Sequence, residues 1–370
     1  TYSGEVKPAT VTASSDWQGP AASGITISYI KTGTYGQQIL ENGALPTNAG
    51  EYTASISVTD KSDNNTTASV GYIIKRATPT AGDFIFQAPD SLTYNGTPKT
   101  AAVASSKIGM GEVTVKYYQG ETEVPPINAG KYIVKISVEE GTNYSAATGL
   151  TADGWKFSIT KAAAPTMQPI ELTVINGLAK TYLVNLPALP TLGDNCKYGS
   201  INYEACNFDL IGEGGYANST ATITSNDEFQ LTVPAVESQT EGSVGTVGVK
   251  ITTDNYQDML LTVEVIAKNK IVPVLDGEIT ATPITFGQIL RVSTITGTMK
   301  DDGKTVEGTF EWTDPSTKPD KAGDYQAEWT FTPAEGYEEY ATATGTVTIK
   351  VNKADPTFNA PTAQENLTYT

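Results

Sequence analysis

The sequence has no histidine and only two cysteines among its 370 residues. Histidine is the usual general base near neutral pH, so its absence excludes a Ser-His-Asp or Cys-His catalytic arrangement. Catalysis would then depend on carboxylates, tyrosine or lysine. The adjacent acids Glu139–Glu140 and Glu338–Glu339 do not suit a shared reaction, because neighbouring strand residues point to opposite faces. We therefore expect no enzyme, no catalytic residue and no cofactor.

Leucine, arginine and methionine are scarce, and no stretch shows sustained 3.6-residue periodicity. The chain is instead rich in threonine, valine, isoleucine, tyrosine and glycine. This mixture favours strands and tight turns over helices. The sequence therefore predicts an all-β protein.

Basic residues are outnumbered, with 24 lysines and arginines against 41 aspartates and glutamates and a net charge of −17. A nucleic-acid partner is not expected, since phosphate binding needs clustered lysine and arginine. The acids are scattered, which is typical of solubilising charge on exposed strand faces. No signal peptide or long apolar run is present, so we expect no membrane insertion in this stretch and place any targeting signal outside it.

One thirteen-residue pattern occurs three times: PTNAGEYTASISV from Pro46, PINAGKYIVKISV from Pro126 and PDKAGDYQAEWTF from Pro319. From the tyrosine onward, every second residue is apolar, which indicates a strand with one face on a core. The proline and glycine before it supply a turn, because proline fixes φ and glycine tolerates positive φ. The pattern contains no nucleophile or base. It predicts architecture rather than a ligand loop around Asn48 and Asn128.

Proline-containing junctions recur at Pro79, Pro165, Pro273 and Pro356, each after an alternating strand and a lysine. Units of this size are typical of tandem β-sandwiches, and the chain is too long for one sandwich core. Because short linkers with proline are semi-rigid, we expect immunoglobulin-like β-sandwich domains arranged as an elongated rod. The predicted domains are residues 1–76, 77–162, 163–269 and 270–354, with 355–370 as the first strand of a further repeat.

The first and last predicted segments read as incomplete copies. TYSGEVKPATV from Thr1 matches TYNGTPKTAAV from Thr93, and FNAPTAQENLTYT at the end matches FIFQAPDSLTYNG from Phe84. The domain at 1–76 is therefore expected to lack its first strand and to expose an unpaired sheet edge. We expect 355–370 either to fray or to exchange as a strand with the first domain of another copy.

The segment 163–269 lacks the thirteen-residue pattern and is longer than the others. We expect a divergent β-sandwich with an inserted loop, and any binding specificity in that loop, because loops on a rigid scaffold carry function. The inserted stretch is NGLAKTYLVNLPALPTLGDNCKYGSINYEA from Asn176; it contains Cys196, and Cys206 directly follows it. Their spacing across an expected hairpin permits a disulfide in an extracellular compartment, and it equally permits two free thiols in a core.

A calcium site and an aromatic sugar-binding platform are two further alternatives, and both are less favoured than a purely structural role for these residues. TDKSDNNTT from Thr59 and the turn at Asp301 offer oxygen ligands for calcium, but they lack EF-hand spacing and match ordinary hairpin turns. We expect no metal, and zinc would need more soft ligands than two cysteines. An exposed aromatic platform that stacks on a sugar ring is a second alternative, formed by Trp17, Tyr117, Tyr118 and Tyr340, although tyrosine is common on sheet faces in any case.

The shared segments resemble a known family. LTYNG, VTVKYY, PINAGKYIVKISVEEGTNYSAA and FSITKAAAP in the second domain are similar to bacterial immunoglobulin-like repeats of the MBG and YDG type. ITFGQIL and the run from Thr294 to Pro333 look like a related variant. The likeness is fair over the first domain and weak over the third. Such repeats occur in tandem in surface proteins of Gram-positive bacteria, usually upstream of a wall anchor, so the resemblance implies an extracellular place at the cell surface or cell wall. The family brings no catalytic residue.

These observations predict a non-catalytic stalk that spaces a distal domain from the cell wall. The alternative is an adhesion module that binds a host or plant glycan, or a host surface protein, through residues 163–269. The stalk is favoured because repetition accounts for it without any binding site.

Overall fold

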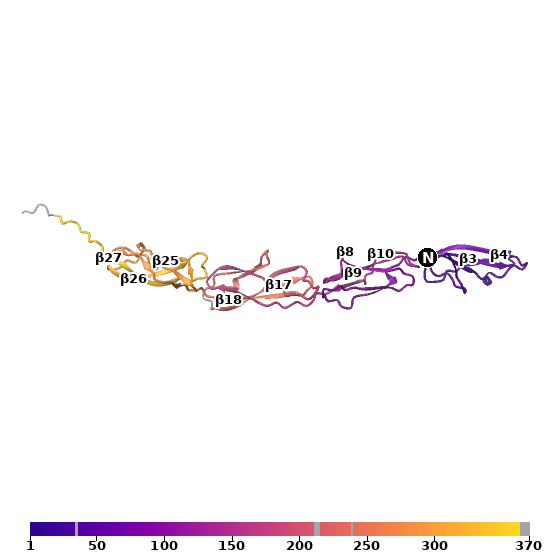
Figure 1. Cartoon of the computed structure of the whole chain (residues 1–370), viewed down its shortest axis with the longest axis horizontal. Coiled ribbons are helices and arrows are strands. Elements are labelled where there is room, and N and C mark those ends of the chain that lie inside the picture. Colours follow the sequence, from indigo (N-terminus) through magenta and orange to yellow (C-terminus); the bar gives the residue numbers. More distant parts are fainter. Residues whose placement is uncertain (34–35, 211–214, 238–239, 363–370) are drawn as a thin grey trace, which may run out of the picture. The chain divides into compact units, whose positions relative to one another are not determined.

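The computed structural model describes residues 1–33, 36–210, 215–237 and 240–362, and the prediction of an all-β protein is confirmed (Figure 1). The helices in these ranges are single 3₁₀ turns: η1 (Ala22–Gly24), η2 (Ala81–Asp83), η3 (Tyr216–Asn218) and η4 (Leu290–Val292). Within the same ranges, none has the length and apolar character needed to span a bilayer. The strands fall into four successive groups, described below by the predicted domain ranges.

The first domain, 1–76, has one antiparallel sheet in the order β2-β1-β3-β4. Its strands are β1 (Ser28–Gly33), β2 (Gly36–Ile39), β3 (Gly50–Thr59) and β4 (Asn65–Ile74). Residues 1–27 contain no strand, although the Tyr2 amide donates to the Lys75 carbonyl at 2.7 Å. Most of β4 is exposed. The absence of an initial strand before Thr1 stays a prediction.

The second domain, 77–162, is a sandwich of two antiparallel sheets. One sheet pairs β5 with β6, and the other has the order β10-β9-β7-β8 with β11 also paired to β9. Its strands are β5 (Phe84–Gln87), β6 (Ala102–Ser105), β7 (Val113–Gln119), β8 (Thr122–Glu123), β9 (Gly130–Val138), β10 (Ala147–Leu150) and β11 (Lys156–Ile159). Phe86 of the smaller sheet stacks on Trp155, with ring centroids 6.1 Å apart. The aromatic contact closes the core between the two sheets.

The third domain, 163–269, also has two sheets, in the orders β12-β18-β17-β14 and β13-β16-β15. The pair β12 and β18 is parallel, whereas the neighbouring pairs β17–β18 and β13–β16 are antiparallel. Its strands are β12 (Ile170–Ile175), β13 (Lys180–Asn185), β14 (Ile201–Leu210), β15 (Thr220–Ile223), β16 (Glu228–Val233), β17 (Gly242–Thr253) and β18 (Met259–Lys268). The predicted insertion therefore contributes strands β13 and β14, with a loop at 186–200 between them.

The fourth domain, 270–354, contains a sheet in the order β21-β27-β26-β25 and the smaller sheets β19-β23-β24 and β20-β22. Its strands are β19 (Val274–Leu275), β20 (Thr280–Ala281), β21 (Ile284–Thr285), β22 (Ile295–Thr296), β23 (Met299–Asp301), β24 (Lys304–Val306), β25 (Gly308–Trp312), β26 (Gly323–Pro333) and β27 (Ala343–Asn352). One core joins these sheets, with Trp312, Trp329 and Phe331 at its centre. Residues 355–362 form no strand and are exposed, and 363–370 lie outside the described residues.

The thirteen-residue pattern forms a turn and a half-buried strand in all three places. Its glycine begins β3, β9 and β26, and each of these glycines has positive φ, as at Gly130 (φ 150°). In β9, Tyr132, Val134 and Ile136 are buried, whereas Lys131 is exposed. Burying each such apolar side chain contributes about 1.5–3 kcal/mol. Period-two alternation therefore identified the core face correctly.

The chain divides into two compact units. The first unit comprises Thr1–Pro165 together with the segments Thr191–Ile201 and Thr252–Asp258; the second comprises the remaining residues. Two loops of the third domain therefore belong to the same compact unit as the first and second domains.

Candidate functional site: the junctions between domains

A backbone bridge of one design occurs at three of the predicted domain junctions. Within the second domain, the Ala77 amide donates to the Asn143 carbonyl and the Ser145 amide donates to the Ala77 carbonyl, both at 2.9 Å. Ala162 forms the same pair with Asn255 and Gln257, again at 2.9 Å. Such a parallel bridge ties a short linker to a loop, which restricts the φ and ψ angles through which the linker can swing.

The third bridge of this design lies in the fourth domain. The Ile271 amide donates to the Glu339 carbonyl at 2.9 Å, and the Ala341 amide donates to the Ile271 carbonyl at 2.7 Å. The bridges centre on a tyrosine, Tyr144, Tyr256 or Tyr340. The linkers that the prolines predicted are thus anchored by hydrogen bonds that the sequence did not indicate.

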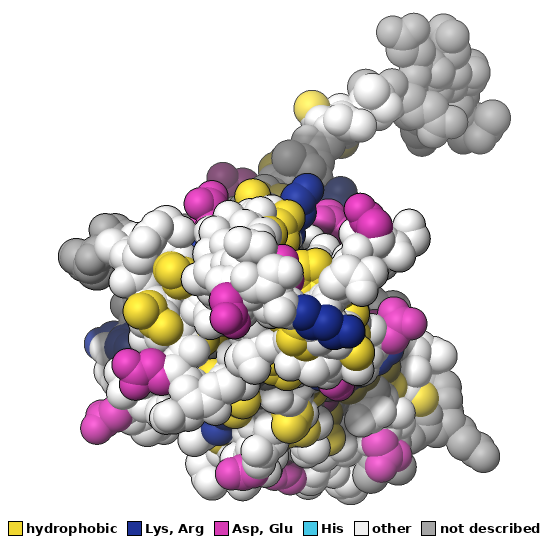
Figure 2. All heavy atoms as spheres, turned by 90° about the vertical axis from the view of Figure 1, so that its right-hand side faces the viewer, with side chains coloured by type: hydrophobic (Ala, Val, Ile, Leu, Met, Phe, Trp, Pro, Cys, Tyr) yellow, Lys and Arg dark blue, Asp and Glu magenta, His cyan; other side chains and the backbone are white. Residues whose placement is uncertain are grey.

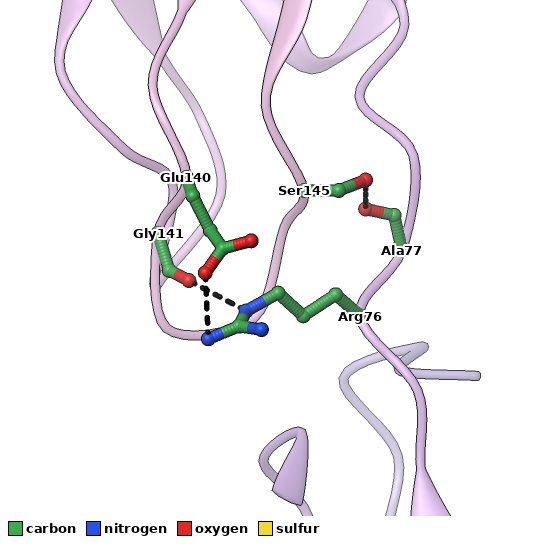
Figure 3. Close-up of polar contacts among 5 residues, drawn as sticks. All are labelled: Arg76, Ala77, Glu140, Gly141 and Ser145. Atoms are coloured by element: carbon green, nitrogen blue, oxygen red, sulfur yellow. Dashed lines mark hydrogen bonds and ion pairs between the residues drawn. The ribbon is translucent and has the colours of Figure 1, made fainter.

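Side chains reinforce the first bridge, as Figure 3 shows. The Arg76 guanidinium donates through Nε to the Gly141 carbonyl at 2.9 Å and pairs with the Glu140 carboxylate at 3.2 Å. Ser145 Oγ donates to the Ala77 carbonyl at 3.2 Å. Both partners of the ion pair are about half exposed, so the pair itself contributes at most about 1 kcal/mol. The backbone bridge, not the ion pair, is the main restraint.

A buried asparagine precedes the bridging tyrosine at two junctions. Asn143 is 1 % exposed, and its Oδ1 accepts a hydrogen bond from the Ala49 amide at 2.9 Å while Nδ2 donates to Asn48 Oδ1 at 3.0 Å. It thereby connects a loop of the second domain to the Asn-Ala-Gly turn of the first. Sequence reasoning missed Asn143, although the repeated Asn-Tyr dipeptide was a signal for it.

Asn255, also 1 % exposed, makes equivalent contacts with the turn of the second domain. Its Oδ1 accepts from the Ala129 amide at 2.9 Å, and its Nδ2 donates to Asn128 Oδ1 at 3.2 Å and to the Lys197 carbonyl at 3.0 Å. The side chains of Asn48 and Asn128, for which the sequence favoured a purely structural role, therefore accept hydrogen bonds from a neighbouring domain.

The predicted inserted loop is partly used for packing. Leu192, Cys196 and Tyr198 are partly buried against the core of the second domain, and Tyr256 is a buried member of that core. Burial against its neighbours raises the pKa of Tyr256 to about 12, with a further contribution from a hydrogen bond with Cys196. These residues are not free for ligand contact, which reduces the surface that this loop offers for binding.

The two cysteines occupy different settings, and both thiols are free in this structure. Cys196 lies in a turn where its amide donates to the Gly193 carbonyl at 3.1 Å, and Cys206 lies within β14. Each is partly buried. The sequence left a disulfide and two free thiols equally open, and this structure has the free thiols.

The aromatic platform, the less favoured alternative, is not supported by the structure, because its four members are partly buried. Tyr117 packs on Phe157, with ring centroids 6.0 Å apart, and its hydroxyl oxygen accepts from the Ala101 amide at 2.9 Å. Trp17 donates through its indole nitrogen to the Pro20 carbonyl at 2.8 Å. Tyr118 and Tyr340 are likewise partly buried. The side chains that were to stack on a sugar are engaged in the fold.

The two calcium candidates are hairpin turns. Asp60 Oδ1 accepts from the amides of Ser62 and Asn64, and these bonds lower the pKa of its carboxyl group. Asp302 has φ 43° in the turn between β23 and β24. Over the ranges that the structure describes, no three acidic or cysteine side chains gather as a metal site.

Acidic side chains are spread over the face seen in Figure 2, with lysine or arginine side chains among them. A shallow groove of about 210 Å³ in the first domain is lined by residues that include Ala9, Val11, Ile56 and Val70. Its polar lining residues are Thr10, Thr12 and Ser69, and none of its lining residues is charged.

Several solved structures are similar to this chain at low sequence identity. No curated protein matches the sequence. Among solved structures, the chain is similar to immunoglobulin domains 1–5 of Sidekick-1 at 11 % identity and TM-score 0.31, covering 89 % of this chain and 74 % of that one. It is also similar to extracellular cadherin domains 3–6 of protocadherin gamma B2 at 13 % identity and TM-score 0.25, covering 95 % and 97 %. The human desmocollin-1 ectodomain is similar at 10 % identity and TM-score 0.21, covering 91 % and 74 %.

A family model supports the resemblance read from the sequence. It is described as the MBG domain, and it matches residues 90–163, which make up most of the second predicted domain. The matched segment includes the second copy of the thirteen-residue pattern and the Asn143–Tyr144 dipeptide. The resemblance to MBG-type repeats is therefore confirmed over residues 90–163.

Proposed function

We propose that this chain is a non-catalytic spacer of a bacterial surface protein, holding a distal domain away from the cell wall. The resemblance to MBG-type repeats supports placing it outside the cell, at the surface or wall of a Gram-positive bacterium. The junctions between domains would be essential to this role, because a spacer keeps its two ends far apart only when successive domains have a restricted orientation.

The observation that carries the proposal is the recurrence of one linker bridge. Ala77, Ala162 and Ile271 each exchange two backbone hydrogen bonds with a tyrosine-centred loop. These six hydrogen bonds join backbone groups of a linker to backbone groups of a loop, so their role is to restrain the linker. Each is worth about 0.5–1.5 kcal/mol, which is enough to bias a short linker strongly towards one conformation. A restrained linker between separate cores is what a spacer needs.

Small-angle X-ray scattering on the full chain tests the proposal. A compact globule of this length would have a radius of gyration of about 21 Å. We expect a value at least about twice as large, together with a distance distribution that has a long tail, as for a chain of domains in line. A radius near the compact value would overturn the spacer.

A glycan array on the same chain tests the adhesion alternative. The spacer predicts no glycan that binds above the level seen with an unrelated acidic β-protein. Specific binding that is lost when residues 186–200 are altered, but kept when the exposed tip at Asp60–Asn64 is altered, would instead favour adhesion through the third domain.

A further inference from the structure

The buried asparagine at the bridge is present at two junctions and absent from the third. All three bridges have the same two backbone hydrogen bonds, so the backbone geometry does not require asparagine. Residues Asn143 and Asn255 precede the bridging tyrosine in the second and third domains, but Glu339 holds that position in the fourth. The Glu339 side chain is partly exposed and makes no hydrogen bond or ion pair with any residue that the structure describes. A role other than the bridge must account for the asparagine.

The choice of residue follows the preceding domain. Where the preceding domain has an Asn-Ala-Gly turn, at Asn48 or Asn128, the next domain carries the buried asparagine. The third domain has no such turn, and the domain that follows it carries glutamate instead. The two features therefore occur together or not at all.

The chemistry explains why the two features go together. The Ala49 amide needs an acceptor and Asn48 Oδ1 needs a donor, and the primary amide of Asn143 supplies both from one planar group. Because the backbone N–H of Ala49 can only donate, the Asn143 side-chain oxygen must face it, and the Asn143 NH₂ group must therefore face Asn48. An aspartate would provide the acceptor but not the donor, and a lysine only the donor. At 1 % exposure, water does not replace a missing partner, so each unmatched group carries its full desolvation penalty.

We propose that Asn143 and Asn255 are recognition residues by which one domain selects its neighbour: the Asn-Ala-Gly turn is an interaction surface, and its partner is a β-domain with asparagine before the bridging tyrosine. This goes beyond the spacer proposal, because a spacer whose junctions restrict orientation without selecting which domain follows would still hold its ends apart. The selection is directional, since the turn supplies a backbone donor and a side-chain acceptor, and the following domain supplies the complementary amide.

Directionality gives a sharp test with two substitutions of the same kind. Asn48→Asp keeps an oxygen to accept from Asn143 Nδ2, so the contact is retained. Asn143→Asp replaces the NH₂ group with a carboxylate oxygen. This oxygen would face two acceptors that now receive the NH₂ group, Asn48 Oδ1 at 3.0 Å and the Ile108 carbonyl at 3.4 Å. Both substitutions remove one amide and add one negative charge, but only the second breaks the recognition.

Residue-resolved hydrogen–deuterium exchange on the full chain provides the readout. In Asn143→Ala and Asn143→Asp we expect the Ala49 amide to exchange about tenfold faster, while the Ala129 amide is unchanged. Asn255→Ala should produce the reciprocal result, faster at Ala129 and unchanged at Ala49. Asn48→Asp should leave Ala49 protected within about twofold. Glu339→Ala is the matched control at the third bridge and should leave the Ile271 amide as protected as before.

Exchange along β9 shows in the same data whether the second domain is folded. If Asn143→Ala loses that protection, Asn48→Lys provides a second route, because it alters only the turn of the first domain. It removes the acceptor and should speed exchange at Ala49 while β9 stays protected. Unchanged exchange at Ala49 and Ala129 in folded variants, or equal effects of Asn48→Asp and Asn143→Asp, would overturn the recognition proposal. Neither outcome bears on the radius of gyration that tests the spacer.

Discussion

The Tyr132 hydroxyl donates a hydrogen bond to the backbone carbonyl of Asn128, 2.8 Å away and four residues earlier in the chain. Tyr52 makes the same bond to Asn48, also at 2.8 Å. Each ring is buried at the start of a strand, so the bond folds the strand back onto the turn that precedes it. In the first two copies of the pattern, the tyrosine therefore has a role that another large apolar residue could not fill. It also fixes the turn that Asn143 or Asn255 contacts.

Replacing Tyr132 with phenylalanine keeps the ring and removes this bond. We expect the second domain to lose about 1 kcal/mol of unfolding free energy, because the Asn128 carbonyl loses a partner in a partly buried site. Native-state hydrogen exchange of the slowest β9 amides in the full chain measures this change. Tyr325→Phe is the matched control, because Tyr325 occupies the same place in the fourth domain and makes no such bond with a described residue. Equal effects of the two changes would contradict the role given to the hydroxyl.

Tyr72 predicts how the first domain responds to alkali. Burial raises the pKa of Tyr72 to about 12, and the neighbouring phenols of Tyr29 and Tyr52 add to the shift. Its hydroxyl also donates to the Lys7 carbonyl at 2.9 Å. Because the folded-state pKa lies above the unfolded value of about 10, the folded state holds the proton more tightly. The resulting stabilisation is complete below pH 10 and is lost as pH rises towards 12.

The measurement is a difference titration of tyrosinate absorbance between the unaltered chain and Tyr72→Phe. The difference isolates Tyr72, and we expect its midpoint near pH 12 when both chains are native and near pH 10 when both are unfolded in urea. The first domain of the Tyr72→Phe variant should also melt with a weaker dependence on pH between about 10 and 12. A native midpoint near 10 would show that Tyr72 is not shielded from water.

The strands could be predicted from the sequence because the alternation of apolar and polar residues that indicates a strand lies within a few neighbouring residues. In β7, Val113, Val115 and Tyr117 share one parity, and all three lie against the core of the second domain. The same alternation assigns Tyr117 to the core face of β7, which is a reason to leave it out of the candidate sugar platform. The buried contact of Asn255 with Asn128 was beyond this reasoning, because it joins residues 127 positions apart whose own neighbourhoods look like ordinary polar turns. Only the fold brings such polar groups together and buries them.

The free thiols of Cys196 and Cys206 can be counted directly. Because the structure has no bond between them, alkylation of the unfolded chain without reductant should add two carbamidomethyl groups. Intact-mass spectrometry before and after reduction measures this. A chain that takes up none until it is reduced would have the disulfide that the spacing permits, and the loop around Cys196 would then have to move from its packing against Tyr256.

Gly245 in β17 should be the least replaceable glycine of the third domain. It lies at a register shift between β17 and β18, with φ 119°, and an added Cβ would overlap the Asp209 carbonyl oxygen on the neighbouring strand β14. Gly245→Ala therefore combines backbone strain with a backbone clash, and we expect a loss of about 2–4 kcal/mol.

Gly193→Ala is the control for this change, because a Cβ at Gly193 meets no atom within 4 Å and should change stability by less than about 0.5 kcal/mol. Exchange of the β17–β18 ladder amides in the full chain measures both variants. If Gly245→Ala left that ladder protected, β14 would have to be free to shift away from β17. The bulge would then be a tolerated irregularity, whereas the close approach of Asp209 indicates that the glycine is required by the packing of the two strands.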